Sequence, residues 1–77
     1  MKTNYDQVSE FAIELTNARK KFPTFNSAHE GYSVLLEEVD ELWDEVKQRN
    51  QSIEIMRKEA VQIGAMALAF IVEVCNG

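Results

Sequence analysis

The feature that most constrains the fold is an apolar run near the end of the chain. Between Ala60 and Val72 the only polar side chain is that of Gln62. A helix that is apolar on all sides has to be buried on all sides. The rest of a 77-residue chain can supply about two more helices, which cannot surround this one. We therefore expect a second copy of the chain to cover part of it.

The length points to one domain, spanning residues 1–77. A chain this short buries only roughly 60–65% of the surface exposed by its unfolded form, so its stability should depend on a partner or a ligand. The single cysteine, Cys75, rules out an internal disulfide and suits a reducing cytoplasm. We expect a homodimer or a homotetramer in the cytoplasm.

Charge and hydropathy exclude two classes of partner. A net charge of −5 argues against nucleic acid, which binds to basic surfaces. The first residues lack the apolar segment of a secretion signal, and the run 60–72 is too short to span a bilayer. We therefore expect no nucleic acid and no membrane as partners. An anionic ligand is still compatible with thirteen acidic residues if a cation lies between them.

The periodicity predicts three helices. The first runs from Asn4 or Tyr5 to Lys21, and Pro23 ends it. The second helix begins at a capping box that starts with Ser27, and this helix extends to about Arg49. The third helix begins after an N-cap at Ser52 and extends to about Val74. The fold class is therefore all-α, with three helices per chain that complete a four-helix-type bundle by oligomerisation.

Residues 35–46 combine a helical apolar stripe with a dense acidic run. Six of the nine residues from Glu37 to Glu45 are acidic, and Glu38 and Glu41 flank the stripe. Like charges at this spacing are unfavourable unless something offsets them, and a divalent metal would do so. The alternative is a solvated acidic face. The stripe itself, within about 120° of arc, consists of Leu35, Leu36, Val39, Leu42, Trp43 and Val46.

Two polar residues enter the otherwise apolar third helix. Glu59 and Gln62 are three residues apart, and burying them is costly unless they meet a partner. Helices joined by short loops pack antiparallel, so Glu59 should face Glu38 and Glu41. Mg²⁺ prefers oxygen ligands of this kind and would bridge the three carboxylates. The alternative is a polar layer satisfied without metal.

These residues resemble a known family. Glu37-Glu38-Val39-Asp40-Glu41, followed after seventeen residues by Glu59-Ala60-Val61-Gln62, is similar to the pattern of the all-α, MazG-like nucleoside triphosphate pyrophosphohydrolases. The resemblance implies that Glu38, Glu41, Glu59 and Gln62 hold Mg²⁺, with Mn²⁺ as an alternative. It also implies that Glu37, Glu38 and Glu41 act in catalysis. The chain departs from the family at Gln62, where the family has an aspartate.

The implied activity is hydrolysis of a (d)NTP to the monophosphate and pyrophosphate, as in house-cleaning enzymes. Lys20 and Lys21 are candidates to bind phosphate, although their place at a helix end also suits the helix dipole. Phe25 and His29 are candidates to contact the base. Two alternatives remain: a nucleotide-binding helical oligomer without turnover, and a structural or regulatory helical oligomer without ligand. Arg19 and Trp43 are further candidates for substrate contact.

Overall fold

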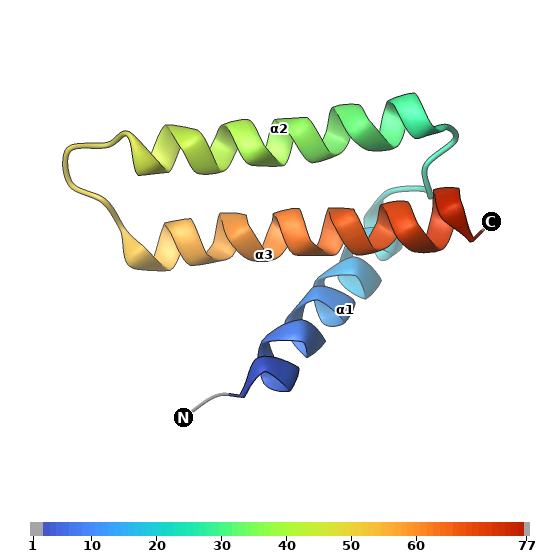
Figure 1. Ribbon diagram of the computed structural model, residues 1–77, viewed down its shortest axis with the longest axis horizontal. Coiled ribbons are helices and arrows are strands. Elements are labelled where there is room, and N and C mark those ends of the chain that lie inside the picture. Colours follow the sequence, from blue (N-terminus) through green and yellow to red (C-terminus); the bar gives the residue numbers. More distant parts are fainter. Residues whose placement is uncertain (1–2, 77) are drawn as a thin grey trace.

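The computed structural model describes residues 3–76, which form three α-helices and contain no strand. The helices are α1 (Asn4–Lys21), α2 (Ala28–Val46) and α3 (Ile53–Ala69), as labelled in Figure 1. A π-helical segment, η1 (Phe70–Cys75), continues α3. The predicted all-α class and the three helices are confirmed.

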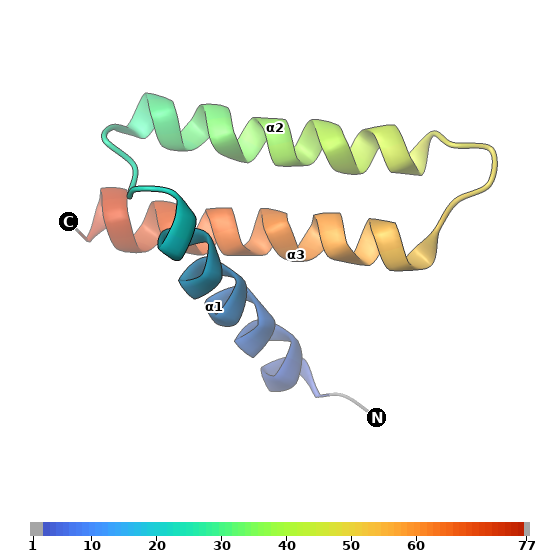
Figure 2. The ribbon, with the colours of Figure 1, turned by 180° about the vertical axis from the view of Figure 1, so that it is seen from behind.

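The α3 helix is the centre of the molecule. It packs along α2, to which it runs antiparallel, and α1 crosses it obliquely (Figures 1 and 2). Within residues 3–76, no Cα atom of α1 lies within 8 Å of a Cα atom of α2. α3 is therefore covered by two helices that do not contact each other through their backbones, and part of its surface stays open between them.

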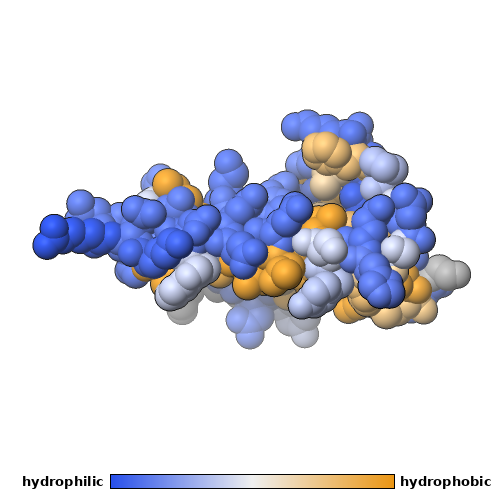
Figure 3. Space-filling view, turned by 90° about the horizontal axis from the view of Figure 1, so that it is seen from above, coloured by the Kyte–Doolittle hydropathy of each residue, from blue (hydrophilic) through white to orange (hydrophobic). Residues whose placement is uncertain are grey.

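The core of the single chain is small. Among the described residues, the buried hydrophobic side chains are Ala65, Met66 and Ala69, all on α3. The apolar stripe of α2 is only partly covered, because Leu36, Val39 and Trp43 are 42–57% exposed. Seen from above α2, the surface is mainly hydrophilic, with hydrophobic areas along its edges (Figure 3). The stripe predicted to face the core is thus wider than the surface that α3 covers. Its half-buried members are Leu35, Leu42 and Val46.

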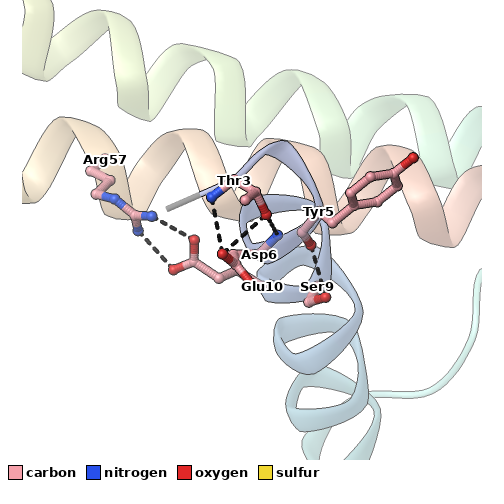
Figure 4. Close-up of polar contacts among 6 residues, drawn as sticks. All are labelled: Thr3, Tyr5, Asp6, Ser9, Glu10 and Arg57. Atoms are coloured by element: carbon pink, nitrogen blue, oxygen red, sulfur yellow. Dashed lines mark hydrogen bonds and ion pairs between the residues drawn. The ribbon is translucent and has the colours of Figure 1, made fainter. Parts of the chain in front are cut away.

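Side-chain caps fix the helix starts. Thr3 and Asp6 form a capping box at α1, with bonds of 3.2 and 2.9 Å that Figure 4 shows. The side chain of Ser27 accepts a bond from the backbone N–H of Glu30 at 3.1 Å, but the Glu30 carboxylate accepts from the backbone N–H of Asn26 and not from that of Ser27. The predicted capping box is therefore wrong in its second half. The predicted cap at Ser52 is present, bonded to the N–H three residues later at 3.2 Å.

Two helix ends differ from the sequence prediction. α2 ends at Val46 rather than near Arg49, because the amides of Gln48 and Gln51 bind carbonyl oxygens of its last turns at 2.9 and 2.8 Å. The third helix reaches the predicted region but changes to π-helical geometry at Phe70. None of the described helices has the length and apolar character needed to cross a membrane.

Two glycines allow aromatic rings to pack against helix backbones. A Cβ atom at Gly64 would lie 2.5 Å from the ring of Phe11, so this glycine lets α1 approach α3. A Cβ atom at Gly31 would lie 2.8 Å from the ring of Phe70 and 3.1 Å from that of Phe25. Both contacts depend on the missing side chain, because neither position has the backbone conformation that favours glycine.

Candidate functional site

Three carboxylates from two helices converge on one point. Glu38 and Glu41 lie one turn apart on α2, and Glu59 projects from the facing side of α3. One oxygen of each residue lies within 4.8 Å of an oxygen of the other two. The antiparallel pairing of α2 with α3 therefore brings together acids that are eighteen or more residues apart in sequence.

The environment of this cluster disfavours full ionisation. Burial raises the pKa of Glu38 to about 7, and the charge and hydrogen bonding of Glu41 and the charges of Glu59 and Glu37 add to the effect. Burial is also the largest cause of the raised pKa of Glu59, and its hydrogen bond to Glu41 is the next. The charge of Lys58 lowers the pKa of Glu59. Near pH 7, binding of a cation or a proton therefore stabilises the cluster.

Lys58 is the one basic residue named above that acts on the three acids, and it does so without an ion pair. Among residues 3–76, none of the ion pairs involves Glu38, Glu41 or Glu59. The pairs that do form link other acids to Arg19, Lys47 and Arg57. The cluster therefore keeps a net negative charge without an ion-paired partner at the edge of the α2–α3 contact.

The donor atoms suit a hard divalent cation in kind and nearly in spacing. Octahedral Mg²⁺ at about 2.1 Å from each ligand places its oxygens about 3–4 Å apart. The carboxylate oxygens of the cluster are at most 4.8 Å apart, which exceeds that spacing by about 1 Å at most. Small side-chain rotations can close this difference. A proton on Glu38, bonded to Glu41, would relieve the same repulsion without metal. The geometry thus fits a metal ion and also fits a protonated acid pair.

Gln62, which the sequence pattern places among the metal ligands, has its amide group bonded to α1. Its Nε2 atom donates to Oε1 of Glu14 on α1 at 2.5 Å, in a partly buried bond. Sequence reasoning missed Glu14 as a partner. Glu10, one turn before Glu14 on α1, accepts a bond from the guanidinium of Arg57, so two acids of α1 bind polar side chains of α3. Figure 4 shows the Glu10–Arg57 pair.

A pocket of about 360 Å³ adjoins the cluster on the open side of α3. Gln62 and Met66 of α3 line it, together with Glu37 and Glu38 of α2. The opposite wall comes from the end of α1 and the loop that follows it, including Phe25. The volume lies in the range of small-molecule sites, which are about 300–1,000 Å³. One pocket thus joins two predicted catalytic acids to one predicted base-contacting ring.

Four of the predicted substrate contacts do not line this pocket. Lys20 and Lys21 are exposed and do not line it. His29 lines a separate surface hollow with Tyr32. Trp43 is 57% exposed and lines none of the pockets described here. Of the predicted contacts, Phe25 and Arg19 line the pocket together with the acids.

Arg19 has a structural partner that the sequence did not reveal. Its Nε and Nη2 atoms donate to the carboxylate of Glu73 at 2.6 and 2.7 Å, and the guanidinium carbon lies 5.0 Å from the ring centre of Phe25. Glu73 also accepts a bond from the backbone N–H of Phe25 at 3.0 Å. The bond to Arg19 is the main cause of the lowered pKa of Glu73. This arrangement fastens the loop after α1 to the end of the chain.

No protein-family model, curated protein or solved structure matches this chain.

Proposed function

We propose that this protein is a Mg²⁺-dependent nucleoside triphosphate pyrophosphohydrolase of the MazG-like type, which cleaves a (d)NTP to the (d)NMP and pyrophosphate. The observation that carries the proposal is the convergence of Glu38, Glu41 and Glu59, none of which forms an ion pair with a basic side chain of residues 3–76. Three unneutralised carboxylates at the edge of a pocket are an arrangement that a divalent cation stabilises.

Each residue of the site has a role in this proposal. Glu38, Glu41 and Glu59 hold Mg²⁺ or Mn²⁺, which would neutralise phosphate oxygens and polarise a water molecule. Glu37 lines the pocket beside Glu38 and would orient that water, from which a carboxylate of the site would take the proton. The ring of Phe25 offers a surface on which a base can stack at the far wall.

One observation favours a second candidate, a nucleotide-binding protein without turnover. Gln62 carries no charge, and its amide donor is used by Glu14. The cluster therefore has three carboxylates where the family pattern has four. Fewer anionic ligands hold a divalent cation less strongly, so metal binding and catalysis can be lost separately from nucleotide binding.

A nucleotide panel separates these candidates. The purified protein is incubated with each (d)NTP and Mg²⁺ or Mn²⁺, and monophosphate and pyrophosphate are measured together. Glu38→Gln and Glu41→Gln should abolish turnover. Asp40→Asn is the matched control, because it removes the same charge from an exposed position on the same helix.

The outcomes are distinct. Metal-dependent formation of monophosphate and pyrophosphate, lost in both glutamate variants and kept in the control, supports the enzyme. Nucleotide binding without turnover selects the second candidate. If neither nucleotide nor divalent metal binds, both candidates are wrong and a structural or regulatory helical oligomer is what remains.

A further inference from the structure

Glu73 holds two residues of the pocket wall without lining the pocket itself. Its carboxylate accepts bonds from Nε and Nη2 of Arg19 at 2.6 and 2.7 Å, and from the backbone N–H of Phe25 at 3.0 Å. Arg19 and Phe25 line the pocket, whereas Glu73 does not, and its side chain is only 9% exposed. Glu73 lies in η1, and π-helical segments are frequent at functional sites. A ligand in the pocket would therefore contact the two neighbours of Glu73 and not its carboxylate.

The ring of Phe25 is fixed on several sides. The guanidinium of Arg19 lies 5.0 Å from the ring centre, which is a cation–π distance. On α2 the ring packs against Gly31, where a Cβ atom would lie 3.1 Å from it. The ring is half-buried and lines the pocket, so part of its surface is available to a ligand. Because the ring is already held in place, a ligand that stacks on it has little side-chain freedom to remove.

Glu73 also ties the loop between α1 and α2 to the third helix. Two other backbone N–H groups of this loop bond to the helices that it connects, Phe22 to the last turn of α1 and Asn26 to Glu30 of α2. Among the hydrogen bonds of residues 3–76, only the Phe25–Glu73 bond joins the backbone of the loop to η1. Since α1 and α2 do not contact each other through their backbones, the position of Phe25 relative to α3 depends on Glu73.

The same carboxylate sets the charge of the far wall of the pocket. Arg19 is the one basic residue of the described chain that lines the pocket, and its ion pair with Glu73 offsets its charge. Glu30 also lines the pocket and adds a negative charge. A phosphate is therefore disfavoured at this wall, whereas an uncharged aromatic ring can stack on Phe25. Phosphates would instead be attracted to a cation at the carboxylate cluster.

We propose that Glu73 is a positioning residue of the nucleotide pocket, which fixes the ring of Phe25 and neutralises Arg19 so that a base, rather than a phosphate, binds at the far wall. This role rests on the proposed function. In the alternative, Glu73 only fastens the end of the chain to α1. The two roles differ once Phe25 has been replaced, because a residue that acts through the ring then has no further effect on nucleotide affinity.

A double-mutant cycle with Phe25→Leu measures this dependence. KM and kcat for the preferred (d)NTP are determined for the wild type, Glu73→Gln, Phe25→Leu and the double variant, at a temperature at which circular dichroism shows all four to be folded. Each single change should raise KM on the order of 10-fold, as expected for a lost base–aromatic stacking contact, and leave kcat nearly unchanged. The double variant should have the KM of Phe25→Leu alone. If the wild type binds without turnover, dissociation constants replace KM.

Glu10→Gln is the matched control. It breaks another pair between a glutamate and an arginine that joins α1 to the third helix, the Glu10–Arg57 pair, and neither residue lines this pocket. KM should therefore stay at the wild-type value. A rise in KM equal to that of Glu73→Gln would show that any loosening of α1 has this effect and would overturn the proposed role.

The remaining outcomes are distinct. Additive effects of the two pocket changes on KM, or a lower KM in Glu73→Gln because the released Arg19 binds phosphate, would overturn the role of Glu73 and leave the proposed function standing. A wild type that binds no nucleotide would overturn both. If a variant does not fold, NMR of the wild type with a non-hydrolysable nucleotide analogue and Mg²⁺ decides. Nuclear Overhauser effects from the base to the Phe25 ring, with the Phe25 amide protected from exchange, support the role, and effects to other side chains instead contradict it.

Discussion

Replacing Glu38 by glutamine tests the electrostatic argument for the site. The pKa of Glu38 is raised from 4.5 to about 7 in the folded chain, so the folded state holds this proton more tightly than the unfolded state does. A shift of this size corresponds to about 3 kcal/mol if none of it is screened. Because the carboxyl group is only half-buried, solvent screening reduces the expected effect to about 1–2 kcal/mol.

The sign follows from proton linkage. The stabilisation is complete below the unfolded pKa and is lost as the pH rises through the folded pKa near 7. Metal-free wild-type protein should therefore lose about 1–2 kcal/mol between pH 5 and pH 8, relative to Glu38→Gln, which has no charge to gain. At pH 8 the variant should melt higher by about 4–8 °C for each kcal/mol.

Thermal and urea unfolding in the presence of a chelator measure this difference, at one fixed protein concentration because the sequence predicts an oligomer. Asp40→Asn is the control for removing a charge from α2, and its pH dependence should match that of the wild type. Adding Mg²⁺ at pH 8 should stabilise the wild type by about 2.7 kcal/mol at one hundred times its dissociation constant, and the variant far less. If Glu38→Gln is no more stable than the wild type at pH 8, or if Mg²⁺ stabilises both equally, the reasoning is refuted.

Three further variants test other contacts. Gln62→Asp should destabilise the metal-free protein by about 1–2 kcal/mol, because it places a carboxylate against Glu14. Adding Glu14→Gln should restore stability and tighten Mg²⁺ binding. A double-mutant cycle measured by urea unfolding checks this, and an absence of coupling would contradict it. Glu73→Gln should lower the free energy of unfolding by about 2–3 kcal/mol at pH 7, because it leaves Arg19 unpaired. The difference from the wild type should shrink as the pH falls through the lowered pKa of Glu73. A difference that stays constant across an acid titration would contradict this cause. Gly64→Val should destabilise the chain by about 1–3 kcal/mol, because the added methyl groups meet an aromatic ring of α1; unchanged urea unfolding would show that the ring moves aside freely.

Local sequence signals predicted the helices well. The start of α1, the cap of α3 at Ser52 and the break at Pro23 follow from residue type and spacing alone. The approach of Glu59 to Glu38 and Glu41 follows from two rules, because residues one turn apart share a side and short-loop helices pack antiparallel. The metal and the activity remain predictions.

The features that sequence reasoning missed depend on how α1 crosses α3. The Arg19–Glu73 pair joins residues 54 positions apart, and the Glu14–Gln62 bond spans 48. Neither pairing follows from the periodicity of one helix, since it is set by the crossing angle and by ring packing against Gly64. The early end of α2 likewise depends on side-chain amides that bind its last carbonyls rather than on apolar spacing.

The separation of α1 from α2 has a consequence for local unfolding. None of the residues of α1 is fully buried, and its helical contacts are made with α3. It can therefore detach while the α2–α3 hairpin stays intact, at a free-energy cost below that of global unfolding. Amide hydrogens of α1 should exchange with solvent earlier than those of the hairpin, and the wall of the pocket that comes from α1 and its loop would open with them.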